Sequence, residues 1–265
     1  MKNLNEYINE GLIRRQSGMD MKSQIEAWLN EHEVTEYIIN DDLTISSGRQ
    51  FDMRVCNFDG TEFPSYIQFG DCSGCESFIL SNCPNLETLR GCPTKVRSFT
   101  CSDCTKLKSL EHGPQEVLNH YYCPNCTSLK NLKGAPTEIS RTFNCSGCTG
   151  LETLEGAPQK VGSFLCHDCN GLTSLKGAPQ KVLDWNPRSA RGFDCSNCEN
   201  LESLEGAPQI TAYIFRCSNC PKLTSLKGIS NNIGRYLECT GCGVEFTYKD
   251  VRKYVKIPES KVYLV

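Results

Sequence analysis

The fold of this chain is decided by the stretch Leu151-Glu-Thr-Leu154-Glu-Gly156-Ala-Pro158-Gln-Lys-Val161-Gly-Ser-Phe164-Leu-Cys166-His-Asp-Cys169-Asn-Gly171. Directly after it, Leu172-Thr-Ser-Leu175-Lys-Gly177-Ala-Pro179 begins the same pattern again. From Cys101 onward, Cys-x-x-Cys pairs recur at steps of 22, 22, 21, 29, 22 and 22 residues. A fixed period of this length is the signature of stacked structural repeats.

Each repeat has the pattern of one short strand followed by a sharp turn. Phe164 and Cys166 are two residues apart, and most copies have a polar residue between the corresponding pair, such as Thr100 or Asn144. This period of 2 places both side chains on the inner face of a strand. Gly156 permits a sharp bend and Pro158 fixes φ, so the chain turns at the same place in every copy. One copy cannot bury its leucine pair alone. The sequence therefore predicts a solenoid of short parallel β-strands and turns, with about eight coils of 21–22 residues.

These positions resemble the leucine-rich repeat family. Its pattern LxxLxLxxN/CxL is matched by Val161, Phe164, Cys166, Cys169, Leu172 and Leu175. The short period is similar to the compact bacterial branch of the family, and the Leu-Glu-Gly-Ala-Pro core is similar to repeats of bacterial and bacteriophage genomes. Two features depart from it: one extra residue follows the ladder cysteine, and Gly-Ala-Pro replaces a proline pair. The resemblance covers roughly residues 51 to 243 and implies a leucine-rich-repeat-like solenoid that binds other proteins.

The two ends differ from the repeats and are expected to cap them. We predict an N-terminal cap of helices and strands over residues 1–50, the solenoid over 51–243, and a small α/β cap over 244–265. The expected elements are a short helix carrying Leu4, Ile8 and Leu12, a second helix opened by a capping box from Ser23 to Glu26, strands at 37–39 and 43–45, a helix at 247–256 and a strand at 261–265. The alternative for residues 1–18 is a docking or targeting peptide.

Composition excludes several functional classes. The 265 residues carry 28 basic and 31 acidic side chains, a net charge of -3, and no polybasic run, so we expect no nucleic-acid partner. The N-terminus lacks the apolar core of a signal peptide, and no apolar stretch approaches a membrane span. We therefore expect a soluble protein that is not secreted through a signal peptide and does not bind membranes. The resemblance to bacterial and bacteriophage repeats implies a setting in a bacterial cytoplasm or a phage virion.

The nineteen cysteines invite a metal hypothesis. Residues Cys101 to Cys126 read C-x2-C-x18-C-x2-C, which is the spacing of four-cysteine zinc sites. If zinc is bound, the expected ligands are Cys101, Cys104, Cys123, Cys126, Cys145, Cys148, Cys166 and Cys169. Against zinc, the spacing follows automatically from the repeat, and cysteine exchanges with Leu80 and, at Cys92, with alanine of other copies. We therefore predict no cofactor and buried, apolar cysteines. The alternative is a zinc-stabilised structural or virion-associated phage component that self-associates.

The repeat also places every cysteine but one. Eight Cys-x-x-Cys pairs begin at Cys72, Cys101, Cys123, Cys145, Cys166, Cys195, Cys217 and Cys239. We expect these sixteen residues to form two columns, with Cys83 in a further coil and Cys56 unplaced. A thiol redox protein is the weaker alternative, because redox Cys-x-x-Cys pairs lie at a helix N-terminus and these follow strands. Enzyme motifs such as GxxxxGK[ST], HExxH and GxSxG are missing, so we predict no catalytic residues.

Two regions are candidates for binding a protein partner or a second copy of this chain. The outward strand column is expected to hold Ile79, Thr100, Tyr122, Asn144, Leu165, Asp194, Arg216 and Glu238, with His167 in the column after the first cysteine. We single out Tyr122, Leu165 and His167, against the alternative of an ordinary solvated sheet face. The longest repeat adds an insertion, and insertions in solenoids are often on the binding side. Its candidate contact residues are Trp185, Arg188 and Arg191.

The residue after the second leucine alternates in charge from copy to copy. The column reads Arg90, Glu111, Lys133, Glu155, Lys176, Glu205 and Lys227. Stacked coils would bring opposite charges together, and a slip by one coil would bring like charges together. We interpret this column as a device that sets the register of the coils rather than as a binding patch.

Overall fold

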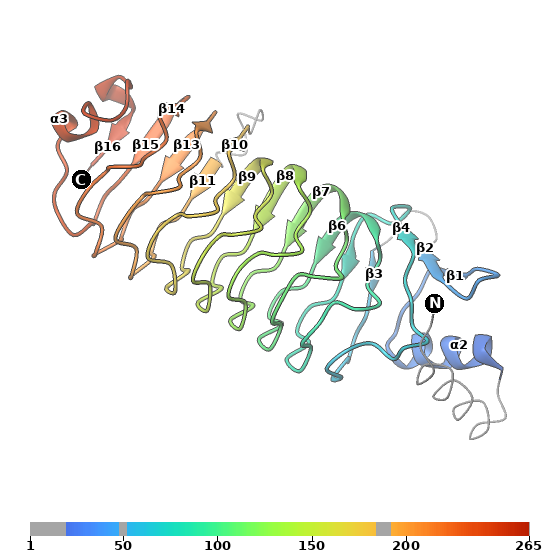
Figure 1. Ribbon diagram of the computed structural model, residues 1–265. Helices are drawn as coiled ribbons and strands as arrows, with labels where there is room; N and C mark the ends of the chain where they lie inside the picture. The colour runs from blue at the N-terminus through green and yellow to red at the C-terminus, as the bar shows by residue number, and fades with distance from the viewer. Residues whose placement is uncertain (1–19, 48–51, 184–191, 265) are drawn as a thin grey trace.

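Short parallel strands, one from each coil, lie side by side along the solenoid (Figure 1). The computed structural model describes residues 20–47, 52–183 and 192–264, which form a parallel β-solenoid of about nine turns with little helix. The middle coils contribute β6 (Lys95–Thr100), β7 (Glu116–Tyr122), β8 (Glu138–Asn144) and β9 (Lys160–Leu165). The predicted stacking of short parallel strands is confirmed, and the turns slightly outnumber the eight coils expected.

Toward both ends, each coil carries two shorter strands instead of one. These pairs are β4 (Asp71–Cys72) with β5 (Phe78–Ile79), β10 (Lys181–Val182) with β11 (Gly192–Asp194), β12 (Ile210–Thr211) with β13 (Ile214–Arg216), and β14 (Asn232–Ile233) with β15 (Tyr236–Glu238). The first strand of a pair aligns with the start of β6 or β9 and the second with its end. The pairing shifts register at the same point between β6 and β7 and between β8 and β9. A bulge there bends the strand and gives every coil a corner.

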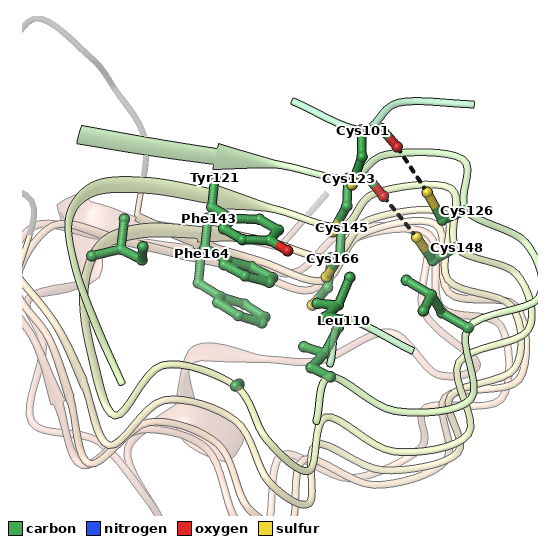
Figure 2. Close-up of a cluster of buried hydrophobic side chains, with 14 of the residues drawn as sticks. Cys101, Leu110, Tyr121, Cys123, Cys126, Phe143, Cys145, Cys148, Phe164 and Cys166 are labelled. Carbon is green, nitrogen blue, oxygen red and sulfur yellow. Dashed lines mark hydrogen bonds between the residues drawn. The ribbon is translucent and has the colours of Figure 1, made fainter. Parts of the chain in front are cut away.

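Aromatic rings stack along the inner face of the sheet. The inward row consists of Phe78, Phe99, Tyr121, Phe143, Phe164, Phe193 and Phe215, all completely buried. The rings of Phe143 and Phe164 are 5.4 Å apart between centroids and only 4° from parallel (Figure 2). Such pairs contribute about 0.5–1.5 kcal/mol each beyond the area they bury. The predicted inward position of Phe164 is confirmed.

A different turn, at the Gly-Ala-Pro position of each coil, lies beside this stack, and we call its middle residue the turn residue. Its N–H bonds the carbonyl of the second leucine in every coil, and the row reads Cys92, Gly113, Ala135, Ala157, Ala178, Ala207 and Ile229. Gly113 occurs in the coil whose ring is Tyr121. A methyl group added at Gly113 would lie 3.3 Å from the Tyr121 hydroxyl oxygen and 2.8 Å from Leu89 Cδ1. The smallest turn residue, Gly113, therefore lies beside the largest ring, Tyr121.

Two turns per coil require unusual backbone conformations. Gly156 has φ +92°, and a Cβ there would lie 2.4 Å from the Lys133 backbone nitrogen, so no larger residue fits. The second turn lies inside the Cys-x-x-Cys segment, where the residue before the second cysteine is left-handed. This row contains Asp103, Asn125, Gly147, Asp168, Asn197, Asn219 and Gly241. Asn, Asp and Gly are the residues that adopt this conformation at least cost.

At the N-terminal end, α2 (Met21–Glu31) covers the first coil. Its Trp28 packs edge-on against Phe63 at 5.5 Å between centroids. The helix begins two residues before the predicted capping box, because the Asp20 side chain accepts the Ser23 N–H and acts as N-cap. The strands are β1 (Tyr37–Ile39), as predicted, β2 (Ile45–Ser47), two residues later than predicted, and β3 (Met53–Arg54). The predicted helix carrying Leu4, Ile8 and Leu12 lies outside the described residues.

At the C-terminal end, the helical part is shorter than predicted. The helix expected at 247–256 is the four-residue α3 (Tyr248–Val251), which begins with a capping box between Thr247 and Asp250. It is followed by a 3-10 turn, η1 (Glu259–Lys261), and by β16 (Val262–Tyr263). β16 pairs in parallel with β15 and extends the sheet by one strand. A strand near this end was predicted correctly.

The structure corrects the placement of three cysteines. Cys72 pairs with Val96, so Cys72 and Cys75 lie in a different row from the other pairs, and the two columns contain seven pairs rather than eight. Cys56 is now placed: it follows Val55, whose N–H bonds the Ile79 carbonyl. The aromatic Phe58 therefore takes the second-cysteine position in that coil. Periodicity misled the prediction because this Cys-x-x-Cys motif begins in the row of Val96, on an earlier strand of the coil than the one that leads into the cysteine columns.

The charged column forms ion pairs between neighbouring coils. Lys133 Nζ lies 3.4 Å from Glu155 Oε1, and Lys176 Nζ lies 3.8 Å from Glu205 Oε1. All four side chains are more than half exposed, so each pair contributes little to stability. These are two of the six neighbouring steps of the column, and the role of the column as a register device stays a prediction.

Candidate functional site

The outward strand row forms one continuous surface along the solenoid. Parallel pairing aligns its eight residues as predicted: Ile79, Thr100, Tyr122, Asn144, Leu165, Asp194, Arg216 and Glu238. Each of them is half-buried. This row, which we call the outward row, mixes apolar, aromatic, amide and charged side chains.

The centre of the outward row contains the first two predicted contact residues. Tyr122 and Leu165 lie in the same row with Asn144 between them. The Tyr122 ring stacks on His120 at 5.2 Å between centroids, and its hydroxyl lies 2.9 Å from His120 Nδ1. This contact holds the tyrosine ring in a defined orientation on the surface. A preoriented aromatic ring loses little conformational freedom on binding.

His167 lies beside the outward row rather than in it. Its carbonyl accepts the Gly147 N–H and its neighbour Asp168 bonds the Ser196 carbonyl, so it stands in the row after the first cysteine. His167 Nδ1 is 2.5 Å from Asp168 Oδ2, and the histidine is half-buried. The carboxylate orients the imidazole and leaves its other nitrogen for a further contact.

The C-terminal part of the outward row is a charged triplet. Arg216 Nε donates to Glu238 Oε2 at 2.8 Å, and Arg216 Nη1 lies 4.0 Å from Asp194 Oδ2. Two carboxylates around one guanidinium give this part of the row a net negative charge. The row therefore changes from apolar and aromatic near its middle to acidic at its end.

The insertion predicted to bind a partner falls mostly outside the described residues. Trp185, Arg188 and Arg191 all lie there. The described structure does show a surface groove of about 450 Å³ at the corners of the neighbouring coils, which the sequence analysis missed. The groove is lined by Val117, Leu118, Glu138, Ile139, Ser140, Lys160, Val161, Gly162 and Leu183. The available signal was the pair Leu118 and Leu183, two leucines at a position where the coils between them have Ser140 and Gly162.

The second cysteines form a ladder of hydrogen bonds, with each thiol donating to the carbonyl of the first-column residue one coil before. We call these cysteines the thiol ladder. The bonds are Cys104 to Leu80 at 3.3 Å, Cys126 to Cys101 at 3.0 Å, Cys148 to Cys123 at 3.1 Å, Cys169 to Cys145 at 3.2 Å, Cys198 to Cys166 at 3.3 Å, Cys220 to Cys195 at 3.4 Å and Cys242 to Cys217 at 3.2 Å. Figure 2 shows two of them as dashed lines. Each thiol gives a partner to a buried carbonyl.

The thiol ladder does not fit a four-thiolate zinc site. Zinc needs deprotonated sulfurs that converge at about 2.3 Å, whereas these thiols use their protons on separate carbonyls. Burial raises the pKa of Cys145 and Cys166, two of the candidate ligands, well above the ordinary thiol value, which favours the protonated thiol. Over residues 20–47, 52–183 and 192–264, no three or more His, Cys, Asp or Glu residues are grouped so that they could hold a metal ion.

Comparison of the chain with protein-family models, with curated proteins and with solved structures gave no match. Fold and composition define the class: a cysteine-rich repeat protein with a parallel β-solenoid. In the part of the chain that the structure describes, no helix has the length and apolar character needed to span a membrane.

Proposed function

We propose that this chain is a non-catalytic protein-binding or scaffolding module that contacts its partner through the outward row. The observation that carries the proposal is the contrast between two rows of the same strands. The inward row repeats an aromatic ring in seven successive coils, whereas the outward row changes chemical class at almost every coil. Packing restricts the inward residues, so the outward residues are the ones available to define a partner.

The chemistry of the outward row favours a protein partner. Tyr122 and Leu165 offer half-buried aromatic and apolar anchors, and serine and amide side chains around them can form hydrogen bonds. This mixture of apolar centre and polar rim is typical of protein interfaces. A phosphate backbone would require clustered positive charge. Instead, the net charge is -3 and the row ends with Asp194 and Glu238 around a single arginine.

We also propose that the solenoid is of the leucine-rich repeat kind. Support comes from the pattern residues Val161, Phe164, Cys166, Cys169, Leu172 and Leu175, which are all buried. The thiol ladder takes the place of the Asn/Cys ladder that the repeat pattern contains. With this proposal go the roles of α2 and of the α3–β16 segment as caps, and a setting in bacterial cytoplasm or a phage virion.

Site-specific photo-cross-linking tests the proposed binding face. A benzophenone amino acid replaces Tyr122 or Leu165 on the outward row, and the control protein carries it at Lys130, an exposed turn residue paired with Glu152 at 2.8 Å. Each protein is irradiated in an extract of the cells that naturally express the gene, and adducts are identified by mass spectrometry. Circular dichroism verifies that all three proteins are folded.

The proposal predicts one discrete protein adduct from positions 122 and 165 that is absent from position 130. An adduct whose mass is twice that of the chain identifies a second copy as the partner. Adducts of equal yield from all three positions, or from position 130 alone, would exclude the outward row as the binding face.

A further inference from the structure

The thiol ladder has one member that no further coil covers. In the interior of the solenoid each ladder thiol is overlaid by the next repeat, and Cys148, for example, is completely buried. No Cys-x-x-Cys coil follows Cys242, so this residue is only half-buried. Among the described cysteines, Cys56 and Cys242 alone are not fully buried. Solvent and small oxidants therefore have access to the ladder at its C-terminal end.

Cys242 lies next to a second thiol. Its Sγ is 3.6 Å from the Sγ of Cys239, close to van der Waals contact. Gly241 between them has φ +61° and folds the Cys-x-x-Cys segment so that both sulfurs face the same side of the turn. A small rotation about the two Cα–Cβ bonds is enough to bring sulfurs at this separation to the bonding distance of about 2.05 Å.

We propose that Cys239 and Cys242 form a peroxide-sensitive dithiol, a modification site at the C-terminal end of the solenoid. Cys242 Sγ attacks one oxygen of hydrogen peroxide, the O–O bond breaks, and the products are a sulfenic acid and one water. Cys239 Sγ then attacks Cys242 Sγ, displaces the hydroxyl as a second water, and forms the S–S bond. Both thiol protons leave in the two waters. The two sulfurs together lose two electrons, and the peroxide gains them.

The direction of attack follows from access. Cys239 is 1% exposed, so the peroxide reaches Cys242 first. The other thiols of the ladder are buried, so peroxide reaches them less easily. Cys56 is reachable, but the described residues provide no thiol beside it.

Oxidation changes contacts at the point where the last strand joins the sheet. In the reduced protein, Cys242 donates to the Cys217 carbonyl at 3.2 Å, and the Cys239 N–H bonds the Tyr263 carbonyl of β16 at 2.8 Å. The disulfide removes the first bond, because the sulfur no longer carries a proton. The dithiol thus connects the redox state to the contacts that hold β16.

The test is peroxide titration of the folded full-length chain, followed by alkylation in denaturant and peptide mapping. We expect one disulfide between Cys239 and Cys242, with loss of two hydrogens, at peroxide concentrations at least tenfold below those that modify Cys145 or Cys148. In Cys239→Ser, the expected product is a sulfenic acid at Cys242 that dimedone traps. In Cys242→Ser, whose hydroxyl can still donate to Cys217, Cys239 should stay reduced.

Three outcomes would overturn the proposal. They are oxidation confined to Cys56, disulfides scattered over the ladder, and equal peroxide sensitivity of the 239–242 and 145–148 pairs. Because the readout is the oxidation state of named thiols, the result does not depend on whether the outward row binds a partner.

Discussion

Replacing one thiol of the ladder tests whether its hydrogen bond stabilises the fold. Cys126 is completely buried, and its Sγ donates at 3.0 Å to the Cys101 carbonyl. Alanine at position 126 removes one buried heavy atom, worth about 0.8 kcal/mol. It also removes the donor from a buried carbonyl, which costs about 1–3 kcal/mol. We therefore expect Cys126→Ala to lower the free energy of unfolding by about 2–4 kcal/mol.

Two matched variants separate the hydrogen bond from packing. Cys123→Ala removes a sulfur of equal burial from the first column and should cost mainly the packing part, about 1 kcal/mol. Cys126→Ser restores a donor at the ladder position and should be more stable than Cys126→Ala. The assay is urea unfolding followed by far-ultraviolet circular dichroism under reducing conditions, with midpoint and slope compared between variants. If Cys126→Ser is no better than Cys126→Ala, and Cys126→Ala costs no more than Cys123→Ala, the role assigned to the ladder is wrong.

Three further predictions follow from the packing and the charges. Lys133→Glu with Lys176→Glu places like charges on neighbouring coils, so the melting temperature should fall at low salt and recover in high salt; an unchanged value would rule out the register device. Gly113→Ala should lower the free energy of unfolding by about 1–3 kcal/mol beside Tyr121 and by less in a Tyr121→Phe background. A double-mutant cycle in urea measures the difference, and equal losses in both backgrounds would contradict the size matching of ring and turn residue. Because burial raises the folded pKa of thiols such as Cys220 from 9.0 to about 12, their contribution is complete below pH 9 and is lost as the pH rises toward 12; a melting temperature that stays constant over this range would show that the thiols are not protonated in the fold.

Much of the solenoid was predictable because its fixed positions repeat. Phe164, Cys166 and Leu172 recur at one spacing, and the period alone placed them on the inner face, where they are completely buried. The same logic failed at Cys72, because a local motif match was assigned to a column that its strand pairing does not reach. Position in the coil, rather than the motif, decides the environment of a cysteine.

Features that depend on contacts between coils were less predictable. The sequence placed Cys126 on the ladder, but it gave no sign that the Cys126 thiol donates a hydrogen bond to the Cys101 carbonyl. The helix at 247–256 was overestimated because Thr247 and Asp250 form a strong capping box, whereas the following residues pack as turns. The groove at Leu118 is lined by residues of four successive coils, so its shape depends on how these coils stack.

For the candidate site, the sequence located the row but not its preorganisation. Period 2 places both Tyr122 and His120, two residues earlier on β7, on the outer face, whereas the stacking of the two rings is seen only in the structure. Likewise, Arg216 was expected as one charge of the row, and its pairing with both Asp194 and Glu238 follows from the three-dimensional register.

The central claim is that the cysteines are protonated structural thiols of the solenoid. The most direct measurement is native mass spectrometry of protein purified without chelator under reducing conditions, together with thiol titration in denaturant. The account predicts the mass of the bare chain and nineteen titratable thiols. Stoichiometric zinc, with four cysteines protected from alkylation for each ion in the native protein, would contradict it.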